Sequence, residues 1–317
     1  MTKLVMLEGT PALADELRAE HPGLVVELAA DPDDQARAVA DADALYGLPK
    51  RDVFRAARRV RWIHCPGTGI DPIWSVPELV DSDVVLTNAR GPHAEPMADH
   101  VFAQLLALTH HIPRLLDDQR AHRWATRSYD PRMVELAGKT MGVVALGGIG
   151  QAVARRAHGF GMRVLAVRRH PTDPPPYVEA VWPPDRLDDL LAQADVLAVT
   201  VPLTPETRGM LDARRIGLMR PGSYLIVVSR GGIVDEAALL EALRGRRLAG
   251  AGLDVTATEP LPPDSPLWDA PNLLISPHVS ALTPEMWAGR RAIFKENLRR
   301  FLAGEPFLHV CDKEAGY

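Results

Sequence analysis

The chain contains little cysteine and little lysine. Two of its 317 residues are cysteines, Cys65 and Cys311, and they stand far apart in the sequence. A disulfide framework needs several cysteines at regular spacings, so we expect no disulfide here. Lysine occurs 5 times against 31 arginines, a bias from which we draw no function.

The chain also lacks a long apolar run and an excess of positive charge. No run approaches the roughly 18 apolar residues of a membrane-spanning helix. The formal net charge of −5 argues against nonspecific nucleic-acid binding, which needs a basic surface. The first residues, MTKLVMLEGT, enter a strand-like run without a cleavage-site pattern. We therefore expect a cytoplasmic protein with neither a membrane nor a nucleic-acid partner.

A chain of this length predicts two domains. In the N-terminal third, short apolar runs alternate with helix-like stretches, which favours a small parallel sheet. Strands are expected over residues 4–7, 24–28, 44–46, 62–64 and 84–87, with a helix over 11–20. A long helix is expected over 94–116, interrupted near Pro113 and carrying His110 and His111, and a last helix over 284–302 returns to the first domain.

Residues 138–170 have the pattern of a dinucleotide-binding unit. An apolar run over 140–146 meets the glycine-rich turn Gly147, Gly148, Ile149 and Gly150, a helix follows to about residue 159, and a strand follows over 163–167. In this context the backbone amides of the turn and the helix dipole hold a pyrophosphate. Ala145 replaces the first glycine of the motif, and we expect alanine to fit only if its φ angle is negative.

The end of the second strand indicates which dinucleotide is bound. A cofactor without a 2′-phosphate is normally held there by an acidic residue. This chain has Arg168, Arg169 and His170 instead, and no carboxylate until Asp173. Guanidinium groups bind a phosphate well, so the pair predicts NADP(H) as the preferred cofactor, with NAD(H) as the alternative. The plainer interpretation is a pair of solvated arginines.

Three residues near the C-terminal end have chemistry that complements a hydride donor. Arg230 in VVSRGGIVDE, Glu259 in AGLDVTATEPLP and His278 in LLISPHVSALT each follow an apolar, strand-like run. Each is therefore expected at the carboxyl edge of a parallel sheet, where α/β proteins bind ligands. A histidine exchanges protons near neutral pH, a carboxylate can hold its ring, and an arginine clamps a carboxylate. The set suits the reduction of a 2-keto acid.

Each of these residues also has a plainer interpretation. A histidine is more often a surface or structural residue, Glu259 stands in a proline-rich loop composition, and Arg230 before two glycines can simply end a strand. His93 is a weaker candidate for approaching substrate. No set of metal ligands converges in the sequence, since His64 and Cys65 have no second cysteine nearby, so we expect no metal site.

The segments above, in this order, resemble the D-isomer-specific 2-hydroxyacid dehydrogenase family over essentially the whole chain. GTGID at 67–71, NARGPHAEPMADH at 88–100 and VPLTPETRGML at 201–211 resemble its substrate loop, inter-domain segment and cofactor-side loop. The predicted fold is α/β, with two Rossmann-like domains built on doubly wound parallel sheets. The substrate domain is expected to be discontinuous, over 1–98 plus 285–317, and the dinucleotide domain to cover 99–284.

The resemblance implies roles for individual residues. His278 is the proton donor to the keto oxygen, Glu259 is its partner, and Arg230 binds the carboxylate and carbonyl of the substrate. Backbone amides around Thr68 and Gly69 complete the carboxylate site. The cofactor side is implied to include, beside the glycine turn and the arginine pair, Val201, Pro202, Thr207, Val228, Ser229, Asp254 and Ser280.

The chain departs from the family pattern at two places. Val227, Val228 and Ser229 stand where asparagine and threonine or alanine are common, and Ser280 with Ala281 alters the common PHIGS-like sequence after His278. The second departure affects the expected hydrogen bond to the nicotinamide amide. Neither removes a chemical role.

The expected activity is the NADPH-dependent reduction of a small 2-keto acid, with glyoxylate and hydroxypyruvate as the first candidates, to the D-2-hydroxy acid. Tyr46 and Trp287 are candidates for lining the side-chain pocket. By resemblance we expect a homodimer, with residues 112–137, including Trp124 and Tyr129, as an exchanged arm. Two alternatives stay open: a related dehydrogenase acting on formate, phosphite or 3-phosphoglycerate, and a nucleotide-sensing dimer similar to transcriptional corepressors.

Overall fold

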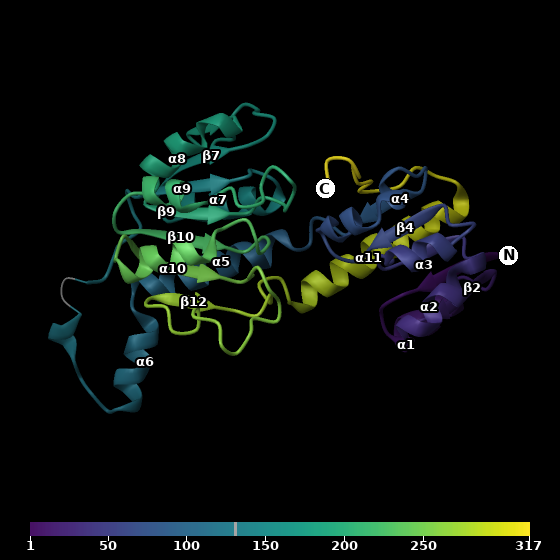
Figure 1. The fold of residues 1–317 in the computed structure, drawn as a ribbon, viewed down its shortest axis with the longest axis horizontal. Helices are drawn as coiled ribbons and strands as arrows, with labels where there is room; N and C mark the ends of the chain where they lie inside the picture. The colour runs from purple at the N-terminus through teal and green to yellow at the C-terminus, as the bar shows by residue number, and fades with distance from the viewer. Residues whose placement is uncertain (130–131) are drawn as a thin grey trace. The chain divides into compact units, whose positions relative to one another are not determined.

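The computed structural model describes residues 1–129 and 132–317, which form two units. Unit 1 comprises Met1–Pro92 and Thr283–Tyr317, and unit 2 comprises His93–Leu282. In Figure 1, unit 1 contains the purple, blue and yellow ribbon, whereas unit 2 contains the teal and green ribbon. The sequence analysis placed the two crossings after residues 98 and 284.

Unit 1 is built on a five-stranded parallel sheet of order β2-β1-β3-β4-β5. Its strands are β1 (Thr2–Met6), β2 (Leu24–Leu28), β3 (Ala44–Tyr46), β4 (Trp62–Cys65) and β5 (Val85–Asn88). Successive residues of β1 enter different core clusters, with Leu4 and Met6 in one and Val5 in the other. Side chains alternate across a strand, so both faces of this sheet are buried, as parallel sheets require.

Unit 1 contains four shorter helices and the last, longer helix of the chain. The shorter ones are α1 (Pro11–Glu20), α2 (Pro32–Ala38), α3 (Arg51–Ala56) and α4 (Pro77–Val80), and the last is α11 (Pro284–Ala303). Both α1 and α11 begin after a threonine whose hydroxyl accepts a backbone N–H, and both have proline in the first turn. Trp62 of β4 packs against Phe301 and Phe307, with ring centroids 5.3 Å and 5.1 Å away, and this aromatic cluster fastens α11 to the sheet.

Unit 2 is built on a seven-stranded parallel sheet of order β12-β11-β10-β9-β6-β7-β8. The strands are β6 (Thr140–Val144), β7 (Arg163–Val167), β8 (Ala180–Trp182), β9 (Val196–Val199), β10 (Ser223–Val227), β11 (Leu248–Leu253) and β12 (Leu273–Ile275). Strand order runs outward in both directions from β6 and β9. Ligands of doubly wound sheets bind beyond the carboxyl ends of the strands at such a point.

The helices of unit 2 are α5 (Ala94–Thr109), α6 (Ile112–Arg120), α7 (Gly148–Gly159), α8 (Leu187–Gln193), α9 (Ala213–Leu218) and α10 (Glu236–Arg244). The helix predicted over 94–116, with an interruption near Pro113, is divided into α5 and α6 two residues before that proline. His111 adopts a left-handed φ of 52° and separates α5 from α6, and Pro113 then lies in the first turn of α6. Proline begins the second helix because its missing N–H is not needed in a first turn. His110 and His111 therefore lie between two helices.

Two further sequence-based expectations concern cysteines and membranes. Cys65 and Cys311 are both buried in the same core cluster of unit 1, and burial raises the pKa of Cys311 to about 12. Among the residues with described coordinates, no helix has the length and apolar character needed to cross a membrane.

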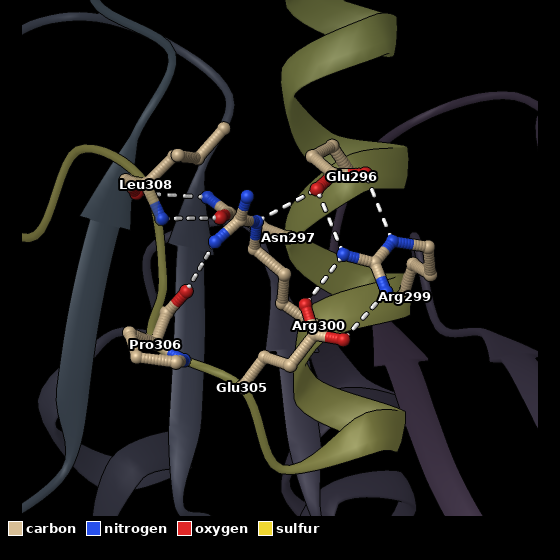
Figure 2. A network of polar contacts seen from close by, with 7 residues as sticks. All are labelled: Glu296, Asn297, Arg299, Arg300, Glu305, Pro306 and Leu308. Atoms are coloured by element: carbon tan, nitrogen blue, oxygen red, sulfur yellow. Dashed lines mark hydrogen bonds and ion pairs between the residues drawn. The ribbon is translucent and has the colours of Figure 1, made fainter.

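A buried asparagine fixes the segment that follows α11. The Asn297 side chain donates to the carbonyl oxygen of Leu308 at 3.0 Å and accepts the Leu308 N–H at 2.8 Å (Figure 2). Around it, Arg299 and Arg300 pair with Glu296, and Arg299 also pairs with Glu305. The Asn297 side chain is inaccessible to solvent, whereas 48% of the Arg299 side chain is exposed.

We predict that Asn297→Ala destabilises unit 1 by about 2 kcal/mol, since it leaves the N–H and the carbonyl of half-buried Leu308 without their side-chain partner. Arg299→Ala, from the same network, is the control and should cause no resolvable change because exposed ion pairs are screened by water. Urea unfolding followed by circular dichroism measures both variants. Equal losses in the two would show that the ion pairs, and not the amide of Asn297, hold this segment.

Candidate active site

The three predicted catalytic residues follow three neighbouring strands of unit 2. Arg230 comes after β10, Glu259 is in the loop after β11, and His278 comes after β12. Because the strands are parallel and adjacent, their carboxyl ends meet at one edge of the sheet. The sequence expectation for all three positions agrees with this topology.

The imidazole of His278 contacts the carboxylate of Glu259. The Nδ1 atom lies 2.8 Å from Oε2, and the two side chains are 47% and 38% exposed. The other carboxylate oxygen accepts the backbone N–H of Thr256 at 3.1 Å, which fixes the orientation of the carboxylate. A carboxylate only accepts hydrogen bonds, so Nδ1 carries a proton and Nε2 is left to exchange one with a substrate.

The backbone of His278 has an unusual conformation that Asp254 holds in place. His278 has a φ of 55°, in the left-handed region that non-glycine residues seldom adopt. Its N–H donates to the carbonyl oxygen of Asp254 at 2.8 Å. The Asp254 carboxylate accepts the N–H of Val279 at 2.9 Å, the N–H of Ser280 at 3.0 Å and the hydroxyl of Ser276 at 2.6 Å. Asp254, predicted to lie near the nicotinamide, is fully buried and serves the loop that carries His278.

Arg230 is half-buried, and its segment lies against the loop of Glu259. Its Nη1 atom donates to the carbonyl oxygen of Ser229 at 2.9 Å. A Cβ atom on the next residue, Gly231, would stand 1.9 Å from the carbonyl oxygen of Thr256. Only glycine allows this approach, which brings the segments of Arg230 and Glu259 together. Ser229 and Val228, both predicted on the cofactor side, are buried, and the Ser229 hydroxyl has no hydrogen-bond partner among the described residues.

Thr68 and Gly69, predicted to bind the substrate carboxylate, belong to unit 1. The Asn88 side chain donates to the carbonyl oxygen of Thr68 at 2.7 Å, which fixes the loop after β4. The Thr68 hydroxyl is buried and has no hydrogen-bond partner in the described part of the chain. In the same unit, burial and the charge of Arg290 lower the pKa of His64 to about 3, so His64 is a neutral core histidine and no proton donor.

The glycine turn leads directly into α7, as predicted. Gly147 is the N-cap of α7 and offers no side chain to cap the helix, and Cβ atoms on Gly147 or Gly148 would meet nothing within 4 Å. The first backbone N–H groups of α7 are therefore open to a ligand. A Cβ on Gly150 would lie 2.1 Å from the carbonyl oxygen of Ala145, so this position requires glycine. Amides without side chains at a helix N-terminus fit the pyrophosphate of a dinucleotide.

The expectation that Ala145 keeps a negative φ is wrong. Its φ is 76°, so alanine occupies the left-handed conformation that glycine adopts without strain. The Thr200 hydroxyl, directly after the neighbouring strand β9, donates to the carbonyl oxygen of Ala145 at 2.8 Å and stabilises the turn. The turn keeps its glycine-like shape and alanine bears the strain.

The arginine pair follows β7 as predicted. Arg168 is half-buried and donates to the Thr172 hydroxyl at 3.3 Å, while Arg169 is exposed. The pKa of the Glu206 carboxyl is lowered, mainly by hydrogen bonds from the Thr204 side chain and from the Glu206 backbone. The positive charge of Arg169 adds a smaller effect in the same direction. Glu206 lies in the predicted cofactor-side loop, where the Thr207 hydroxyl donates to the carbonyl oxygen of Pro202 at 2.7 Å and orders the turn after Val201.

The match to a family model decides the family. The model described as the NAD binding domain of D-isomer specific 2-hydroxyacid dehydrogenases matches residues 102–280. The chain belongs to the D-isomer specific 2-hydroxyacid dehydrogenase family. The residues that the sequence analysis assigned to catalysis and to the cofactor in unit 2 all lie in the matched segment, and a nicotinamide cofactor follows from the family model.

Curated members of this family resemble the chain at similar levels. It is 37% identical over 285 residues to D-3-phosphoglycerate dehydrogenase of Mycobacterium bovis, covering 87% of this chain and 52% of that protein. The chain thus spans about half the length of these dehydrogenases. It is 36% identical over 301 residues to glyoxylate/hydroxypyruvate reductase B of Pectobacterium carotovorum subsp. carotovorum, covering 92% and 93% of the two chains.

A solved structure of the family has the same fold. An NADPH-dependent glyoxylate/hydroxypyruvate reductase from Sinorhizobium meliloti, in complex with NADP and sulfate, superposes with a TM-score of 0.86. The sequences are 29% identical, and the match covers 100% of both chains. The predicted fold class, two α/β domains with parallel sheets, is confirmed.

The sequence analysis overlooked some residues around Asp254. Ser276 donates to its carboxylate, and His100 of α5 contacts Ser276 at 2.8 Å. One signal was present, because half-buried His100 and buried Gln104 are polar residues one turn apart on a helix whose buried residues are mostly apolar. Within residues 1–129 and 132–317, no group of three or more His, Cys, Asp or Glu side chains is arranged to hold a metal.

We predict that Ala145→Gly stabilises the protein by about 0.5–1 kcal/mol. Relief of about 1–2 kcal/mol of left-handed strain exceeds the entropy that glycine adds to the unfolded chain. Ala103→Gly, at an exposed position inside α5, is the control and should destabilise by about 1 kcal/mol. Thermal unfolding measures both. If the two substitutions destabilise equally, Ala145 carries no strain.

Proposed function

We propose that this protein is an NADPH-dependent reductase of small 2-keto acids that forms D-2-hydroxy acids. The contact that carries the proposal is the 2.8 Å hydrogen bond between His278 and Glu259, at the sheet edge that Arg230 also reaches. A histidine held by a carboxylate, next to an arginine, suits proton transfer to a carbonyl whose carboxylate neighbour is bound. Family membership supports the same reaction class.

His278 supplies the proton in this proposal. The hydrogen bond from Nδ1 to Glu259 aims the ring and stabilises the positive charge that the ring carries while Nε2 also holds a proton. Nε2 donates that proton to the keto oxygen, and in the oxidative direction neutral Nε2 accepts it back. A reduced nicotinamide, when bound, supplies the hydride.

Arg230 binds the carboxylate of the substrate and stabilises negative charge that develops on the keto oxygen. The close approach of Gly231 to Thr256 fixes the segment that carries this guanidinium. The backbone amides around Thr68 and Gly69, in unit 1, stay predicted contacts of the substrate carboxylate. The pocket roles of Tyr46, Trp287 and His93 stay predictions.

The arginine pair supports NADPH as the preferred cofactor. Arg168 and Arg169 follow β7, and the chain offers no carboxylate there before Asp173. Together with the open amides of α7, these cations suit a ribose that carries a 2′-phosphate. The reductase of Sinorhizobium meliloti, which shares the fold over its full length, is NADPH-dependent by its name.

Two substrate classes are supported by relatives. Similarity over 92% of this chain to a glyoxylate/hydroxypyruvate reductase favours glyoxylate and hydroxypyruvate. The 37% identity to a D-3-phosphoglycerate dehydrogenase makes 3-phosphoglycerate the second candidate. We rank the short keto acids first because the relatives that support them match the chain over nearly their whole length.

A homodimer is part of the proposal, with residues 112–137 as the exchanged arm. Apolar side chains support it, since Trp124 is 97% exposed and Ile112, Leu116 and Met133 are also exposed. Residues 130–131 of this arm lie outside the described residues. The cytoplasmic location stays a prediction.

The test is an initial-rate assay of glyoxylate, hydroxypyruvate, pyruvate and phenylpyruvate, each with NADPH and NADH, and of 3-phosphoglycerate oxidation with both oxidised cofactors. We expect the highest kcat/KM for glyoxylate or hydroxypyruvate, and at least about tenfold higher with NADPH, equivalent to about 1.4 kcal/mol. Turnover of 3-phosphoglycerate alone would select the second candidate. A higher kcat/KM with NADH would contradict the cofactor assignment.

The arginine pair is tested by Arg168→Ala and Arg169→Ala. Loss of one charge-assisted hydrogen bond to the 2′-phosphate should raise the KM for NADPH about 10- to 100-fold and leave the KM for NADH nearly unchanged. Arg244→Ala, on the exposed face of α10, is the matched control and should change neither constant. Parallel changes with both cofactors would indicate a structural role for the pair.

A further inference from the structure

Two polar side chains of α5 reach the loop of the catalytic histidine. His100 and Gln104 stand one turn apart on this helix, and their Nε2 atoms lie 2.8 Å and 3.2 Å from the hydroxyl of Ser276. The rest of the buried face of α5 is largely apolar, with Val101, Leu105 and Leu108 in the core. Polar groups on such a face need partners, and Ser276 supplies one.

The donors and acceptors of this contact have a definite direction. The Ser276 hydroxyl has one proton, which it donates to the Asp254 carboxylate at 2.6 Å. Its oxygen is then left to accept from the Gln104 amide and from His100. The Nε2 atom of His100 therefore carries a proton, and it also lies 3.7 Å from an oxygen of Asp254. Asp254 directly follows β11 and faces two further elements, the segment after β12 and α5.

Asp254 also holds the backbone of the loop that carries His278. Its carboxylate binds the N–H groups of Val279 and Ser280, and its carbonyl oxygen binds the N–H of His278. The left-handed backbone of His278 costs about 1–2 kcal/mol, so it persists only where its surroundings fix it. A rotation of the Asp254 carboxylate would release both loop amides at once.

We propose that His100 and Ser276 are positioning residues for His278. His100, on α5, holds the Ser276 hydroxyl, and Ser276 in turn holds the Asp254 carboxylate, so that the loop 276–280 keeps the His278 ring on Glu259. Gly252 leaves room for the Gln104 amide, because a Cβ at that position would stand 2.3 Å from the Gln104 side chain and displace the group that donates to Ser276. The effect on turnover rests on the proposed reductase activity, whereas the effect on the loop does not.

The variants are chosen to separate positioning from simple core packing. His100→Leu and Ser276→Ala remove the hydrogen bonds with little change in volume, and His100→Gln keeps an N–H donor at the reach of Nε2. His110→Gln is the control, since His110 is exposed beyond the end of α5. For each variant the measurements are kcat and KM for the best keto acid, the Kd for NADPH by fluorescence, the melting temperature, and amide hydrogen exchange of residues 276–280.

We expect His100→Leu and Ser276→Ala to lower kcat about tenfold, the equivalent of one hydrogen bond of about 1.4 kcal/mol, with Kd for NADPH within about twofold. Exchange in the loop 276–280 should quicken while exchange in β10 stays unchanged. His100→Gln should recover most of the lost turnover, and His110→Gln should match the parent protein.

Two results would overturn the proposal. One is unchanged kcat and unchanged loop exchange in both donor-removing variants. The other is a general loss of stability, turnover and NADPH binding that His100→Gln does not rescue, which would assign a packing role. If the parent protein reduces no keto acid, the proposed function fails, and loop exchange in the variants still decides whether His100 and Ser276 hold the loop.

Discussion

The site depends on the hydrogen bonds between Asp254 and the loop after β12. The backbone N–H groups of Val279 and Ser280 donate to the Asp254 carboxylate, and the N–H of His278 donates to the Asp254 carbonyl oxygen. These hydrogen bonds stabilise the left-handed backbone of His278, in which Nδ1 contacts Glu259 and Nε2 is left for the proposed proton transfer. A buried carboxylate with several donors is a strong anchor, because each bond to a charged group stabilises more than a neutral one.

Close backbone approach is the second constraint, and it operates in both halves of the proposed site. Gly231 allows the segment of Arg230 to meet Thr256, and Gly150 allows α7 to begin directly over the carbonyl oxygen of Ala145. In each case any side chain would collide with backbone, which cannot move aside cheaply. The proposed catalytic cation and the open helix N-terminus are thus set by glycines for which we propose no chemical role.

Much of this arrangement follows from sequence, because apolar runs predict strands and parallel strands gather their ends at one edge. The positions of Arg230, Glu259 and His278 after three neighbouring strands were predicted in this way. The left-handed φ of Ala145 was not predicted. The residue preferences of turns do not include the hydrogen bond from the Thr200 hydroxyl, which stabilises this turn. The interruption of the helix was expected near Pro113 and lies at His111. The contact of His100 with Ser276, 176 residues apart, depends on how α5 packs on β11, which local patterns do not encode.

The central claim is that hydride reaches C2 of a 2-keto acid while the chain protonates the oxygen. Reduction of glyoxylate and pyruvate with NADPH deuterated at C4 of the nicotinamide, followed by NMR and chiral analysis of the products, tests it directly. The account predicts one deuterium at C2 and D-lactate from pyruvate. Formation of L-lactate would contradict it. So would a product that carries no deuterium with both stereoisomers of the C4-deuterated cofactor.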